Sequence, residues 1–351
     1  MHRFRALLVT LTCSLAFACG DREQASPATQ TEPVTTATAS PASDKKVVLY
    51  SGRNEKLIGP LLQQFTQQSG IQVEARYGET AEMAATLLEE GKETPAGVFL
   101  SQDAGALGAV AKAGITRTLP EDVTSRIPAR FVGPQWTWAG VSGRARTIVY
   151  NPSKIRTGQL PQSLQDVASR RYRDRWGIAP LNASFQAQMA VYHALNGPEA
   201  LDALLKAMAD AQPRRYPRNS AIVDAVAAGE IDFGLVNHYY AWEAKKERPD
   251  LPVENYFMPS GDASSFVNVA GVALLDDDPD ALALIRYLVS DEAQRYFATQ
   301  TFEYPLVSTV EPPVALQPLD ELRTPEIDYA RVSEVLPETL AKINASGLSR
   351  N

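Results

Sequence analysis

The sequence predicts a two-lobed α/β protein in which helices cover mostly parallel sheets. Short apolar runs typical of buried strands alternate with amphipathic helical stretches along the chain. About 305 residues follow a polar N-terminal segment, which is enough chain for two lobes. Polar side chains follow several of the predicted strands, and in open α/β sheets ligands bind at that edge.

The first part of the chain predicts three strands, each followed by a helix. The strands are expected at Lys46–Tyr50, Gln72–Arg76 and Val98–Leu100. Pro60 lies inside the first helical stripe, so we expect a kink or a later helix start there. Thr80 is the predicted N-cap of the second helix, and the third is expected from Asp103 to Gly114.

The second part continues the alternation. Further strands are predicted at Thr147–Tyr150, Ile178, Ile231–Val236 and Val269–Leu275, and further helices at Ser184–Leu195, Pro198–Ala209, Ser220–Ala228 and Asp278–Val289. We expect the chain to cross between lobes near Arg146 and Asn268. The N-terminal lobe would then contain residues 46–146 and 269–318, and the C-terminal lobe residues 147–268 and 319–351.

The N-terminus has the pattern of an export signal. Two arginines precede the apolar run Ala6–Ala18, which is too short for a transmembrane helix and fits a signal peptide over residues 1–18. The run ends at Ala18-Cys19, which resembles the lipobox of bacterial lipoproteins and implies lipidation of Cys19. Ordinary cleavage that leaves Cys19 unmodified is the alternative. Residues 19–45 are predicted to form a disordered tether with a reach of roughly 25–30 Å.

Composition narrows the class of function. The formal charge of −7 argues against a nucleic-acid partner and favours cationic ligands. No later run approaches the roughly 20 apolar residues of a membrane span, so contact with the membrane is expected through the lipid alone. We expect a monomer in the periplasm or cell envelope.

Few residues suited to catalysis or to a soft-metal site are present. The only cysteines are Cys13 and Cys19, so the folded part has no disulfide or thiolate site. After signal removal the histidines are His193, interpreted as structural, and His238. The sequence contains no Gly-x-Ser-x-Gly elbow, phosphate-binding glycine loop or histidine-rich metal motif. The protein is therefore predicted not to be an enzyme.

Five short motifs occur in order along the chain: LYSGRNEK from Leu49, TPAGVF from Thr94, VSGRAR from Val141, NASF from Asn182 and NHYY from Asn237. Together they resemble the periplasmic ferric-ion-binding proteins of bacterial ABC importers. The likeness extends from Lys46 to the C-terminal helix. It implies a class II periplasmic-binding-protein fold with a ligand cleft between the lobes. It also implies capture of ferric iron with a synergistic anion, and delivery to an ABC transporter permease.

The resemblance assigns roles to particular residues. It makes Tyr239 and Tyr240 iron ligands, and it places an anion such as carbonate at Asn182, Ala183, Ser184, Asn219 and Asn237. Fe³⁺ is a hard cation that prefers anionic oxygen, and its charge favours the phenolate over the phenol. A strand-to-helix turn would let adjacent phenols reach one ion. Alternatively, the two rings pack a lobe interface beside Trp242.

Departures from the family leave several assignments open. Asn54 and Gln102 stand where some members have His and Glu, and no tyrosine occurs in residues 178–185. Tyr77 is a candidate third ligand, and Arg53 a candidate anion-binding residue, because guanidinium groups pair well with carboxylate-like anions. Six residues are candidates for positioning the metal and anion ligands without binding the metal themselves: Asn54, Thr80, Gln102, Asp103, Arg144 and Arg146.

Two other functions stay open. In the first, the same fold binds a small organic anion or other solute without metal, held by Arg53, Ser184 and Asn219. In the second, the protein is a periplasmic enzyme or an envelope scaffold. The colour of a tyrosine-bound ferric ion would distinguish iron binding from both.

Overall fold

The strands form one mixed sheet in the order β2-β1-β3-β9-β4-β7-β5-β6, with β8 paired to β4. The computed structural model describes residues 45–312 and 316–349, so the predictions for the signal peptide, Cys19 and the tether lie outside the described residues. The strands are β1 (Lys46–Ser51), β2 (Gln72–Tyr77), β3 (Val98–Ser101), β4 (Ala139–Tyr150), β5 (Trp176–Ile178), β6 (Arg214–Arg215), β7 (Phe233–Asn237), β8 (Glu254–Tyr256) and β9 (Val267–Leu274).

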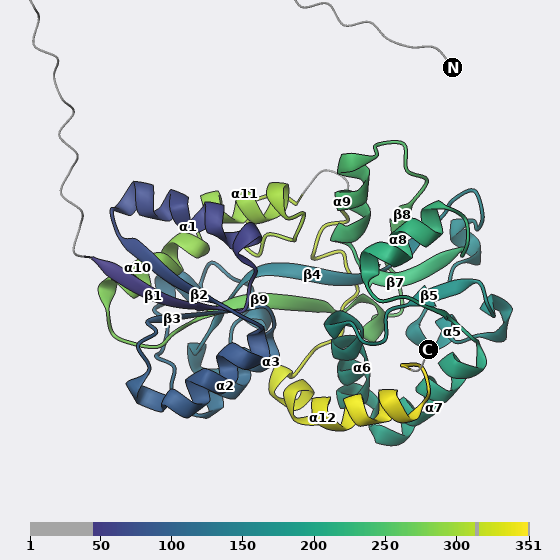
Figure 1. Ribbon diagram of the computed structural model, residues 1–351, viewed down its shortest axis with the longest axis horizontal. Helices are drawn as coiled ribbons and strands as arrows, with labels where there is room; N and C mark the ends of the chain where they lie inside the picture. The colour runs from purple at the N-terminus through teal and green to yellow at the C-terminus, as the bar shows by residue number, and fades with distance from the viewer. Residues whose placement is uncertain (1–44, 313–315, 350–351) are drawn as a thin grey trace, which may run out of the picture. The chain divides into compact units, whose positions relative to one another are not determined.

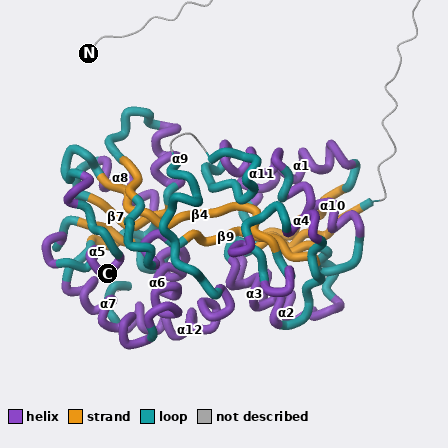
Figure 2. The backbone as a smooth tube through the Cα atoms, turned by 180° about the vertical axis from the view of Figure 1, so that it is seen from behind, coloured by secondary structure: helices purple, strands orange, loops and turns teal. Residues whose placement is uncertain are grey.

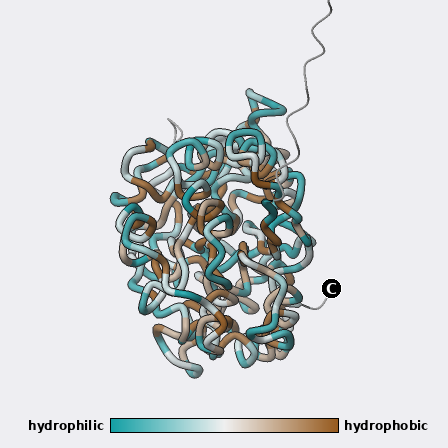
Figure 3. The backbone as a smooth tube through the Cα atoms, turned by 90° about the vertical axis from the view of Figure 1, so that its left-hand side faces the viewer, coloured by the Kyte–Doolittle hydropathy of each residue, from teal (hydrophilic) through white to brown (hydrophobic). Residues whose placement is uncertain are grey.

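Helices cover both faces of this sheet (Figures 1 and 2). They are α1 (Glu55–Ser69), α2 (Thr80–Glu90), α3 (Ala104–Lys112), α4 (Glu121–Thr124), α5 (Leu164–Val167), α6 (Ala183–Asn196), α7 (Pro198–Asp210), α8 (Asn219–Ala227), α9 (Tyr239–Glu247), α10 (Pro279–Leu288), α11 (Asp291–Gln300) and α12 (Tyr329–Ala345). In the end-on view of Figure 3, many apolar segments lie inside the outline and hydrophilic segments lie along its edge.

One long strand joins the two halves of the sheet. β4 has 12 residues, all buried; Ala139–Ala145 pairs with β9, and Arg146–Tyr150 pairs with β7. The sequence predicted only the second half as a strand, Thr147–Tyr150. In the first half, Ser142, Arg144 and Arg146 alternate with small or apolar residues, but the glycines and alanines there are uncommon in strands and make the signal weak.

Two helix starts differ from the prediction. Helix α1 begins at Glu55 and continues through Pro60, its sixth residue, where the missing N–H removes one i→i−4 hydrogen bond to the Lys56 carbonyl oxygen. Thr80 is the first residue of α2 rather than its N-cap, which is Glu79. The Thr80 hydroxyl instead accepts a hydrogen bond from the Gln102 N–H and lies 3.4 Å from the Gly52 carbonyl oxygen, so it joins three strand-end loops.

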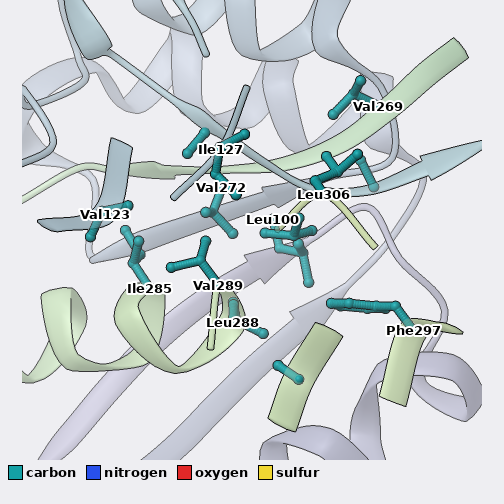
Figure 4. Close-up of a cluster of buried hydrophobic side chains, with 14 of the residues drawn as sticks. Leu100, Val123, Ile127, Val269, Val272, Ile285, Leu288, Val289, Phe297 and Leu306 are labelled. Carbon is teal, nitrogen blue, oxygen red and sulfur yellow. The ribbon is translucent and has the colours of Figure 1, made fainter. Parts of the chain in front are cut away.

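The buried apolar side chains of the described residues form four clusters, of which two are large. The first draws on residues between 47 and 145 and between 267 and 322, and Figure 4 shows part of it, with Leu100 and Val272 beside Leu288. The second draws on residues between 148 and 266, joined by Ile343 and Leu348. Because residues 42–351 form a single unit by backbone contacts, the predicted lobe boundaries stay a prediction.

Candidate functional site

A cavity of about 230 Å³ lies where the ends of several elements meet. Its walls come from the loop before α3, the N-termini of α6 and α9, the middle of β4, and α12. Helix α12 packs against both α3 and α6, and it lies beneath them in Figure 1. Nine of the residues singled out from the sequence line this cavity: Gln102, Asp103, Arg144, Asn182, Ala183, Ser184, Asn237, Tyr239 and Tyr240.

The two adjacent tyrosines begin α9, directly after β7 and His238. Their ring centroids are 4.4 Å apart with the planes tilted by 34°, so both side chains point into one region. The Asn237 side-chain amide lies 3.4 Å from the Tyr239 hydroxyl oxygen and donates to it. Burial raises the pKa of Tyr239, as does the neighbouring Tyr240, whereas the Arg144 charge opposes this rise. Without a cation the Tyr239 hydroxyl is therefore a neutral phenol.

Arg146 lies beneath the tyrosine pair and is 1% exposed. Its guanidinium donates to Gln188, Ser184 and Asn237 at 3.1–3.2 Å, but its Nη2 atom is buried without a hydrogen-bond partner in the described part of the chain. Burial lowers the pKa of Arg146 to about 9, while the two tyrosines act in the opposite direction. This charged donor lacks an acceptor, and a buried unsatisfied group costs on the order of 1–3 kcal/mol or more.

The start of α6 forms a second polar group beside Arg146. Asn182 is the N-cap, and its Oδ1 accepts from the Ser184 N–H, the Ser184 hydroxyl and the Asn219 amide. Because the cap occupies the Ser184 N–H, only the Ala183 N–H stays without an acceptor in the first turn. Asn219 Oδ1 is also buried and unpartnered, next to Ser184. Two residues bonded to Ser184, Arg146 and Asn219, therefore each have a buried polar atom without a hydrogen-bond partner among the described residues.

Arg144 links the tyrosines to the loop before α3. Its Nη2 donates to the Gln102 carbonyl oxygen, and its Nε lies 4.0 Å from Glu303 without a hydrogen-bond partner of its own. Asp103, the next residue after Gln102, uses its Oδ1 to cap α3 through the Ala106 N–H at 3.0 Å. The Arg144 guanidinium, whose charge acts on Tyr239, is thereby bonded to the backbone of the loop before α3.

Arg53 does not fit the predicted anion-binding role. Its side chain is 0% exposed and forms two hydrogen bonds with the Glu303 carboxylate, at 3.1 and 3.0 Å. Ser142 contacts both members of this pair. Burial alone would raise the pKa of Glu303, but Arg53 and Arg144 outweigh it and lower that pKa. Arg53 is absent from the cavity wall because its charge is already matched inside the core.

Two further predicted residues lie elsewhere. The Tyr77 side chain packs against the first apolar cluster, and its hydroxyl lies near Gly59 of α1 rather than near Tyr239. Asn54 is exposed and caps α1 through the Lys56 N–H. The predicted interpretation of His193 as structural fits its hydrogen bond with Thr339 at 2.8 Å.

His238 separates β7 from the tyrosines and faces inward. Its Nε2 donates to the Phe302 carbonyl oxygen, and its Nδ1 accepts from the Ala145 N–H. Burial lowers its pKa to about 4, so the imidazole is neutral at physiological pH. With both ring nitrogens bonded to the backbone, His238 fixes the start of α9 and has no nitrogen free for a ligand.

The bacterial extracellular solute-binding protein family has a model that matches residues 93–333. The chain belongs to this family. The family consists of solute-binding proteins rather than enzymes, which confirms the prediction from the sequence. None of the described helices, which lie within 45–312 and 316–349, is both long and apolar enough to cross a membrane.

Two relatives of this solute-binding protein are named as iron-binding proteins. The chain is 30% identical to the Fe(3+)-binding periplasmic protein of Serratia marcescens over 298 residues, which covers 83% of this chain and 88% of that one. It is 28% identical to the major ferric iron-binding protein of Neisseria meningitidis, covering 82% and 89%. These relatives confirm the predicted resemblance to ferric-ion-binding proteins.

Solved structures agree with this fold. Iron-bound HitA from Pseudomonas aeruginosa superimposes with a TM-score of 0.78 at 29% identity, covering 86% of this chain and 99% of that one. The Trichodesmium IdiA (FutA) protein in complex with iron and citrate gives 0.76 at 26% identity, covering 87% and 100%. The predicted two-lobed α/β fold is confirmed.

Several residues of the site were missed from the sequence. Gln188, one turn after Ser184 on α6, holds the Arg146 Nε, and this spacing on one helix face was the available signal. Asn268, Phe266 and the α12 residues Tyr329, Val332, Ser333 and Leu336 also line the cavity. The sequence of α12 alone did not indicate that this helix packs against α3 and α6.

Proposed function

We propose that this solute-binding protein captures ferric iron through Tyr239 and Tyr240 with a synergistic anion, and passes it to an ABC transporter permease. The observation that carries the proposal is the tyrosine pair, 4.4 Å apart at the start of α9 and open to the cavity. Within residues 45–312 and 316–349 no three His, Cys, Asp or Glu side chains cluster as a metal site, so the anionic oxygen donors that this cavity offers are the two phenols and the Asp103 carboxylate. Fe³⁺ favours such oxygen ligands.

The anion would occupy the space between the tyrosines and the start of α6. The Ala183 N–H in the wall, and Arg146 Nη2, buried next to the wall residues Ser184 and Asn237, are donors without acceptors among the described residues, and Arg144 adds a second positive charge. We therefore assign Arg146, rather than Arg53, as the main charged partner of the anion. Arg146 Nη2 would donate a charge-assisted hydrogen bond to one carbonate oxygen.

Export and anchoring complete the proposal. The signal peptide and Cys19 would place the protein in the periplasm or cell envelope, tethered by lipid and acting as a monomer. The names of the periplasmic relatives support export. A metal-free organic anion as ligand is less well supported, because Arg53, which would have held it, is paired with Glu303.

The test is the visible spectrum and metal content of the iron-loaded protein. A phenolate-to-iron charge-transfer band is expected, and Tyr239→Phe and Tyr240→Phe should each lose or strongly weaken it, because Phe keeps the ring and removes the oxygen. Tyr77→Phe is the matched control and should keep the band. Removing carbonate should weaken iron binding by more than the change in ionic strength explains. Stoichiometric, coloured iron in both tyrosine variants would refute the assignment.

A further inference from the structure

The cavity extends well beyond the tyrosine pair. From Ala183 at the start of α6 its wall continues along that helix to Ala187 and Val191, which is roughly 12 Å at 1.5 Å per residue. On α12 the lining residues include Val332 and Leu336, one turn apart, and Phe266 lies between the elements. We call Ala187, Val191, Phe266, Val332 and Leu336 the apolar end of the cavity.

The two ends differ in chemistry. Around Tyr239 and Tyr240 the walls carry the Arg144 and Asn182 side chains and the Ala183 N–H, whereas the five residues of the apolar end have no side-chain polar atom. Gln186 and Ser333, next to them on α6 and α12, are the polar side chains in this stretch of the wall. An iron ion with a carbonate would replace only the waters at the polar end, and water against the apolar end would find few hydrogen-bond partners.

We propose that the iron enters this cavity as a complex with an organic chelator that has an apolar body. The chelator would present a dicarboxylate-type head to the iron and the arginines, and a hydrocarbon part of about four carbons to the apolar end. This inference rests on the proposed function, and it specifies which counter-ligand accompanies the iron. Burial of hydrocarbon against Val332 and Leu336 removes apolar surface from water on both sides of the contact.

Two anions with the same metal-binding head test the inference. Iron-stripped full-length protein is titrated with ferric malonate and with ferric butylmalonate, and binding is followed by the phenolate–iron band and by dialysis of iron. Each fully buried methylene contributes a factor of roughly four in affinity. With partial burial of four carbons we expect at least tenfold tighter binding with butylmalonate. Equal affinities for the two complexes would overturn the inference.

Two matched variants on α12 test whether the butyl chain binds at the apolar end. Leu336→Gln introduces a polar group at the apolar end and should remove most of the butylmalonate preference, measured as the ratio of the two ferric-complex affinities in the same variant. Leu340→Gln, one turn further on α12, is also half-buried but lies outside the cavity wall, and it should keep the preference. A preference that survives Leu336→Gln would contradict this placement. Absence of the phenolate–iron band with every anion would instead refute the proposed function.

Discussion

Arg53 and Glu303 form a buried ion pair, and its removal should destabilise the fold without affecting iron binding. The two side chains are 0% and 5% exposed and share two hydrogen bonds of 3.1 and 3.0 Å. Removing one member of a buried pair leaves an uncompensated charge and costs about 3–5 kcal/mol. Arg144 lies 4.0 Å from the same carboxylate and offsets part of that cost. We expect Arg53→Met to lose about 3 kcal/mol at pH 7, at the low end of this range.

Urea unfolding followed by circular dichroism measures the loss, and the double variant Arg53→Met/Glu303→Gln identifies its cause. Because the double variant leaves no charge in the pair, it should be less destabilised than the sum of the two single variants. Lys56→Ala, at an exposed position of α1, is the control and should stay within about 0.5 kcal/mol of the unaltered protein. Iron affinity should be unchanged in each folded variant.

The Arg53–Glu303 pair also predicts how acid changes the loss of stability in Arg53→Met. The folded-state pKa of Glu303 is lowered, so its stabilising contribution is present above the carboxyl's ordinary pKa of 4.5 and is lost as pH falls below it. The difference between Arg53→Met and the unaltered protein should therefore shrink in acid. Loss of iron affinity at Arg53→Met, with stability changed by less than about 1 kcal/mol, would contradict this reasoning and return Arg53 to the anion site.

Two other outcomes follow from the site and the N-terminus. Iron binding should strengthen as pH rises, because burial raises the pKa of Tyr239 and each phenol must release its proton to the solvent when iron binds. Up to two protons per iron should be released, measured in weakly buffered solution; no release would refute phenolate ligation. Cys19→Ser should move the protein from the membrane fraction to the soluble periplasmic fraction with iron binding intact, and identical detergent partitioning of both forms would contradict lipidation.

The sequence predicted which residues line the cavity better than it predicted which side chains contact one another. Gln102, Asn182, Asn237 and the tyrosines were found because each follows a strand or begins a helix, and those positions can be read locally. The role of Arg53 depends on Glu303, 250 residues away, and no local pattern indicates that contact. The first half of β4 was missed for a different reason, since its glycines and alanines are uncommon in strands and obscure the alternation of polar residues there.

The continuity of β4 has a mechanical consequence. Arg144 and Arg146 are two residues apart on this strand and therefore on the same face. They hold different halves of the site: Arg144 donates to the Gln102 backbone beside α3, and Arg146 to Ser184 on α6. The backbone pairing changes partner between them, from β9 at Ala145 to β7 at Arg146. Twisting of the strand at that peptide would change the separation of the two guanidinium groups. An anion bound to both guanidinium groups would oppose this twisting of β4.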